Sequence, residues 1–114
     1  MKRAVPLLAA CAAVLIAASA AIAAAPPTLR GSVGPGDTIR LAVKPRKGGV
    51  YRLTVQDAAD DHNFHLRGPG VNLATSVDGT GTRTFRVRLQ PGKTYRFVCD
   101  PHADEMRGSF TVPR

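Results

Sequence analysis

Apolar and polar residues alternate along most of the chain. Phe85, Val87 and Leu89 share one face, and the two arginines between them share the other, which is typical of a half-buried β-strand. The same alternation occurs at residues 51–55 and 39–43. No segment shows sustained helical spacing. The pattern predicts strands near residues 28–33, 37–44, 50–56, 62–67, 82–89, 93–99 and 107–112.

Turn-forming residues separate these runs. Glycine, proline and aspartate gather at residues 34–37, 45–49, 68–70, 78–81 and 91–92. Residues 69–81 form the longest expected loop, and we expect its apolar side chains, Val71, Leu73 and Val77, to pack over a sheet end. Short strands at this spacing predict an all-β fold, namely a two-sheet antiparallel Greek-key β-sandwich of about seven strands.

The N-terminal segment differs from the rest of the chain. Residues 4–25 form an uncharged, Ala-rich apolar run behind Lys2 and Arg3, and small residues at 21–25 match the pattern that a signal peptidase cuts. The pattern predicts a signal helix over residues 1–25, a mature domain over residues 26–114, and export to the periplasm, the cell envelope or the outside of a bacterium. An uncleaved membrane anchor is one alternative, because about 20 apolar residues span a bilayer. Lipidation at Cys11, within a lipoprotein-like box, is another.

The composition limits the fold to one small domain. The chain has 114 residues, with 16 Lys and Arg against 8 Asp and Glu, a formal net charge of +8. Without the signal segment, 14 basic and 8 acidic residues remain, and Cys99 is the one cysteine left. A small domain is marginally stable without a staple, and a single cysteine cannot form an internal disulfide. The thiol is therefore buried and inert, paired between molecules, or bound to a metal.

Side chains that can bind a metal ion are concentrated near the C-terminus. Cys99, His102 and Met106 place a thiolate, an imidazole and a thioether in one predicted loop. Copper favours sulfur and nitrogen donors, and a His₂Cys plane with a long axial Met serves one-electron transfer. Such a site needs a second histidine, and His62 and His65 are the candidates.

The alternation of inward and outward positions along the predicted strand favours His62 over His65 as the second histidine ligand. His62 falls on the apolar face, whereas His65 falls on the polar face with Arg67, so we expect it to face solvent; it stays an alternative ligand. The same count puts Cys99 on the inward face beside Phe97. We therefore expect His62 and Cys99 to meet inside the sandwich.

The second half of the chain resembles the cupredoxins, the small blue copper proteins. The resemblance covers roughly residues 51–112 and is carried by several short motifs together. These are His62-Asn63, the sequence PGKTY at residues 91–95, and Cys99-x-x-His102 followed by Met106 and Gly108.

The resemblance implies a type 1 copper site. His62, Cys99 and His102 would bind one copper ion closely and Met106 would bind it weakly, while Asn63 would tie the His62 strand to the Cys99 loop through hydrogen bonds. Three residues separate His102 from Met106, where the family often has two or four.

The implied function is an exported copper protein that shuttles single electrons between protein redox partners. The first alternative is a copper carrier or buffer that does not transfer electrons. The second is a β-sandwich with a structural or protein-interaction role and an empty site. Since all four ligand positions come from protein, no position is open for a substrate, and we do not expect an enzyme.

Basic residues crowd the second half of the chain. We expect Arg86 and Arg88 to form an outward row on a solvated sheet face. Nucleic acid is not an expected partner of an exported protein, whereas a basic face, or an uncleaved N-terminus, suits an acidic redox protein or an anionic lipid surface. We expect a monomer. Acidic residues near the ligand motifs predict a locally acidic metal end: Asp60, Asp61, Asp100, Asp104 and Glu105.

Overall fold

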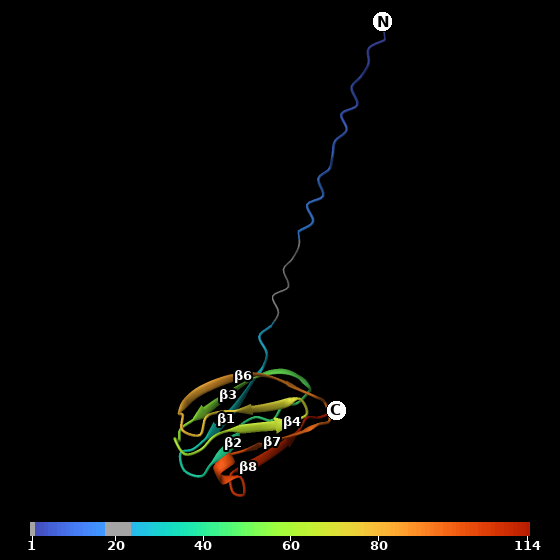
Figure 1. Cartoon of the computed structure of the whole chain (residues 1–114). Helices are drawn as coiled ribbons and strands as arrows, with labels where there is room; N and C mark the ends of the chain where they lie inside the picture. The colour runs from blue at the N-terminus through green and yellow to red at the C-terminus, as the bar shows by residue number, and fades with distance from the viewer. Residues whose placement is uncertain (1, 18–23) are drawn as a thin grey trace.

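Two four-stranded sheets pack face to face in the computed structural model, which describes residues 2–17 and 24–114 (Figure 1). The first sheet has the order β2 (Ile39–Leu41), β1 (Thr28–Val33), β3 (Gly49–Asp57) and β6 (Gly81–Leu89). The second sheet has the order β5 (Val71–Ala74), β4 (His65–Gly68), β7 (Thr94–Val98) and β8 (Arg107–Thr111). The short 3₁₀ helix η1 (Asp100–His102) joins β7 to β8. The all-β two-sheet sandwich predicted from the sequence is confirmed.

The core lies between the two sheets and accounts for the alternation. Inward side chains such as Leu53 and Val55 of β3 are at most 1% exposed, and they meet Leu66 of β4 and Tyr95 of β7 from the opposite sheet. Every buried apolar residue of the described chain lies between Leu29 and Val112. A chain of residues 26–114 therefore contains this core, and we expect it to fold without the preceding segment.

One strand pair departs from the antiparallel arrangement. β1 and β3 are parallel, with Leu29 opposite Leu53 and Val33 opposite Asp57, whereas every other pair is antiparallel. The alternation of side chains specifies which face of a strand is buried but not the direction of its neighbour. The prediction of a wholly antiparallel sandwich is therefore wrong at this pair.

The segment expected to be a loop at residues 69–81 contains a strand. β5 pairs with β4 from Gly68 opposite Val71 onward, so Pro69 and Gly70 form a two-residue turn. Pro fits the first central position of such a turn, and Gly70, with φ of 69°, fits the second. The apolar residues Val71 and Leu73, which alternate with polar Asn72, indicated a strand within the segment that was expected to be a loop.

The strands predicted at 37–44 and 62–67 are both shorter in the structure. β2 covers Ile39–Leu41, because the chain leaves the sheet before Pro45, which has no backbone N–H to donate. β4 begins at His65, so His62 and Asn63 precede the strand.

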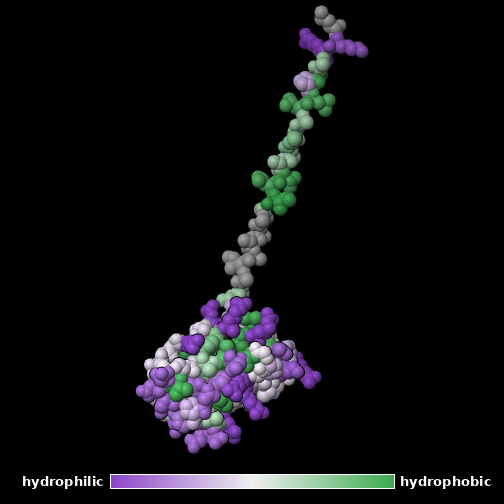
Figure 2. Space-filling model, viewed as in Figure 1, coloured by the Kyte–Doolittle hydropathy of each residue, from purple (hydrophilic) through white to green (hydrophobic). Residues whose placement is uncertain are grey.

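The helix expected in the N-terminal segment is not present in residues 2–17 and 24–25. Its large apolar side chains are between 82% and 98% exposed (Figure 2), and an isolated helix without a packing partner is marginal in water. Residues 18–23 of the expected helix lie outside the described residues. Nowhere in the described chain is there a helix long and apolar enough to cross a membrane. The signal peptide and the boundary at residue 26 stay predictions.

Gly68 gives a test of the core. A Cβ added there would clash with the ring of Tyr95, which is fully buried and whose hydroxyl accepts a hydrogen bond from the Gln90 backbone N–H. We expect Gly68→Ala to lower the free energy of unfolding by about 1–3 kcal/mol in urea denaturation. Gly79→Ala is the control, because its Cβ would lie 3.4 Å from Ser76, an ordinary contact. Equal stabilities of the two variants would contradict this packing.

Candidate metal centre

The structure brings His62, Cys99 and His102 together at one end of the sandwich. His62 lies in the connection between β3 and β4, Cys99 directly follows β7, and His102 ends η1. The two Nδ1 atoms of the histidines are 3.0 Å apart, and Cys99 Sγ lies 3.7 Å from Nδ1 of His62 and 3.6 Å from Nδ1 of His102. His62 and Cys99 are 2% and 0% exposed, while His102 is half-buried. These three side chains form a group that could hold a metal ion.

The spacing of the three atoms fits a bound ion. A point equidistant from them lies about 2.0 Å from each, close to the bond lengths that first-row metals make to imidazole nitrogen and thiolate sulfur. Two imidazole nitrogens facing each other at 3.0 Å need a proton or a cation between them, because their lone pairs repel. The donor set suits a soft or borderline metal.

Carboxylates face the other side of the His62 ring. Nε2 of His62 lies 3.2 Å from Oδ1 of Asp37, in the turn between β1 and β2, and 3.7 Å from Oδ1 of Asp61. An Nε2–H that donates to a carboxylate fixes the tautomer that leaves Nδ1 free as a ligand. Asp37 was not predicted as a site residue; its sequence signal was only the turn at residues 34–37.

The Cys99 loop closes on itself through its backbone. The His102 N–H donates to the Cys99 carbonyl at 3.1 Å, the Met106 N–H donates to the His102 carbonyl at 2.8 Å, and the Cys99 N–H donates to the Met106 carbonyl at 2.9 Å. Pro101, in the first turn of η1, favours the tight bend. The backbone of Met106 is therefore hydrogen-bonded to both His102 and Cys99, and the residue is 1% exposed.

Asn63 links the two loops that carry the group. Its Oδ1 accepts the Asp100 backbone N–H at 2.7 Å, and its Nδ2 donates to Asp100 Oδ2 at 2.8 Å and to the Thr75 carbonyl at 3.4 Å. Its backbone N–H points at Cys99 Sγ, 3.4 Å away. This contact ties the backbone of the His62 loop directly to the sulfur.

The parity argument from the sequence fails around His62. His65, assigned to the outward face, is 8% exposed, and Asn63, which shares its position in the alternation, is 2% exposed. Regular alternation ends because the Phe64 N–H donates to the Thr75 hydroxyl at 2.8 Å instead of to a neighbouring strand. All five residues from His62 to Leu66 are consequently buried.

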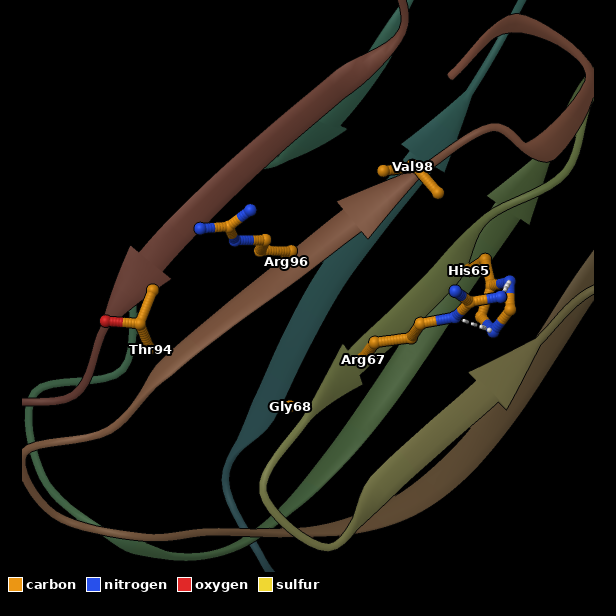
Figure 3. A pocket seen from close by; sticks show the side chains of 6 residues that line it. All are labelled: His65, Arg67, Gly68, Thr94, Arg96 and Val98. Carbon is orange, nitrogen blue, oxygen red and sulfur yellow. Dashed lines mark hydrogen bonds between the residues drawn. The ribbon is translucent and has the colours of Figure 1, made fainter. Parts of the chain in front are cut away.

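His65 is thus not solvent-facing as predicted, and the structure does not bring it into the metal group. Its Nδ1 lies 2.9 Å from both Asp100 carboxylate oxygens, and its Nε2 lies 2.6 Å from Asn72 Oδ1. The guanidinium of Arg67 lies against the same ring, with Nε 3.0 Å from Nε2 (Figure 3). Both ring nitrogens therefore already have partners.

Asp100 is an ionised group held beside the Cys99 loop. Its burial raises the pKa of the carboxyl, but hydrogen bonds from Asn63 and His65 and the charges of His65 and Arg67 together lower the pKa below its ordinary value of 3.8. A sequence pattern shows the Asp in the loop, but it does not show that a histidine and an arginine from β4 meet it.

Comparison with known proteins supports the fold. No family model and no curated protein matches this chain. A solved chain from the cryo-EM structure of a heme-copper terminal oxidase dimer is similar, with a TM-score of 0.53 and 17% sequence identity. The match covers 75% of this chain and 62% of that chain, less than two thirds of its length. At this identity the likeness shows a shared fold.

We expect Asn63→Ala to destabilise the metal-free protein by about 1–3 kcal/mol, because it removes the amide that accepts the Asp100 backbone N–H and donates to the Asp100 carboxylate. Chemical denaturation of residues 26–114 measures this change. Asn72→Ala is the control, since Asn72 is exposed and bonds only the His65 side chain. A larger loss for Asn72→Ala than for Asn63→Ala would contradict the role given to Asn63.

Proposed function

We propose that this chain is an exported, cupredoxin-type electron carrier that binds one copper ion. His62, Cys99 and His102 would be the close ligands and Met106 the weak axial ligand. The observation that carries the proposal is the near-equilateral arrangement of Nδ1, Sγ and Nδ1 around a point at bonding distance from all three.

The donor set and the fold both support copper. Thiolate and imidazole together suit copper, and the similar solved chain comes from a heme-copper terminal oxidase. When bound, copper supplies a one-electron Cu(I)/Cu(II) couple. Hydrogen bonds around the site hold the donors in position, so little has to move when the charge of the site changes.

The exposure of the three ligands gives each a role. The burial of His62 and Cys99 keeps water away from the sulfur. His102 is partly exposed and offers the shortest route from the site to a partner protein. Asp37 and Asp61, 66% and 70% exposed, lie at the same end and give a docking partner a local negative charge to meet. We propose protein redox partners, a monomeric carrier and no enzymatic activity of its own.

Electron exchange separates a carrier from a copper buffer. In mixtures of Cu(I)-loaded and Cu(II)-loaded residues 26–114, we expect NMR line broadening that reports fast exchange between molecules. His102→Ala should bind copper more weakly and exchange electrons more slowly, since it removes both a ligand and the exposed edge. Lys93→Ala, at the opposite end of β7, should leave both quantities unchanged. Tight Cu(I) binding with no measurable exchange in the parent protein would favour the buffer.

A second prediction concerns the partner of His62. We expect Asp37→Ala to weaken Cu(II) binding by about tenfold or more, because the ring loses the acceptor that fixes its tautomer. Asp37→Asn keeps an oxygen acceptor and should lose less. Asp61→Ala, whose carboxylate is farther away at 3.7 Å, is the matched control. Competition with a copper chelator measures all three affinities, and a larger loss for Asp61→Ala would overturn the assignment.

A further inference from the structure

The outer face of the first sheet is strongly basic. Five exposed arginines lie on it, at least one from each of its four strands: Arg30, Arg40, Arg52, Arg86 and Arg88. These five residues are called the basic face below. The one acidic residue in the four strands is Asp57, which is 5% exposed and falls with Val55 on the inward side.

The sheet register concentrates this charge. Arg52 lies directly opposite Arg86, and Arg88 follows two residues along the same side of β6. Like charges directly opposite each other destabilise a sheet. Every ion pair in the described part of the chain involves a histidine, so no carboxylate neutralises these arginines. The charge on the basic face is therefore available to a partner outside the chain.

The chemistry of the face identifies that partner. Threonine and serine hydroxyls lie between the arginines, with Thr54 opposite Arg30 and Ser32 opposite Arg40. No exposed large apolar residue of the described chain lies on these four strands, whereas protein interfaces draw most of their energy from buried aromatic and apolar anchors. Guanidinium groups bind phosphate well. A sheet face with this composition presents several phosphate-binding groups side by side.

We propose that the basic face binds the surface of a membrane rich in anionic phospholipid. Binding does not require copper, because the His62, Cys99 and His102 group lies in loops at the end of the sandwich and not on this face. The metal end then stays open to redox partners while the sheet rests on the lipid.

The second sheet supplies a charge-matched control. Arg67 of β4 lies directly opposite Arg96 of β7 on its outer face (Figure 3), as Arg52 lies opposite Arg86 on the first. Replacing either pair by glutamine removes the same formal charge, although Arg67→Gln also changes a contact with the His65 ring. Thermal unfolding of both variants, and of a second basic-face variant, Arg30→Gln with Arg88→Gln, identifies any variant that does not fold.

The test is co-sedimentation of residues 26–114 with vesicles of phosphatidylcholine, with and without phosphatidylglycerol. We expect binding only when phosphatidylglycerol is present, and weaker binding at high salt. Each arginine at an anionic surface contributes about fivefold in affinity, so Arg52→Gln with Arg86→Gln should bind about 25-fold more weakly. Arg67→Gln with Arg96→Gln should lose less than about threefold.

Three results would overturn the proposal. Equal losses for the two matched variants would show that net charge alone drives adsorption. Absence of binding to the anionic vesicles would rule out a membrane as the partner of the basic face. Binding of a polyglutamate peptide through the basic face, without binding of vesicles, would assign the face to an acidic protein instead.

Discussion

The pairing of Asn63 with Asp100 holds together two loops that are far apart in the sequence. The amide oxygen accepts a backbone N–H of the Cys99 loop, and the amide nitrogen donates to the carboxylate of the same residue. His62 directly precedes Asn63, and Cys99 directly precedes Asp100. The pairing therefore helps to set the distance between the two candidate ligands.

The surrounding polar groups stabilise the charge of this pairing. The Asp100 carboxylate faces His65, and Arg67 lies beside it, so its charge has partners where solvent is partly excluded. On the opposite side, Asp37 meets the far nitrogen of His62. The metal group is thus supported by hydrogen bonds on both sides. A site built in this way binds an ion without first paying to order its ligands.

The sequence predicts those features that depend on local pattern. Alternation predicts most of the strands and the two-sheet fold class, and the short spacing from Cys99 to His102 brings these residues into one turn. Contacts between distant segments leave weaker signals. Parity misplaced His65 because regular strand geometry begins only at that residue, and no alternation reveals that Asp100 would cover its ring. The parallel direction of β1 beside β3 likewise depends on how the chain returns, not on either strand's residues.

The central claim is that two histidine nitrogens and one thiolate are preformed ligands of a single copper ion. X-ray absorption at the copper edge, on residues 26–114 loaded with Cu(I) and with Cu(II), tests it most directly. The account predicts one sulfur and two nitrogens at about 2.0–2.3 Å in both states. A shell of nitrogen and oxygen without sulfur, or loss of a donor on reduction, would contradict it.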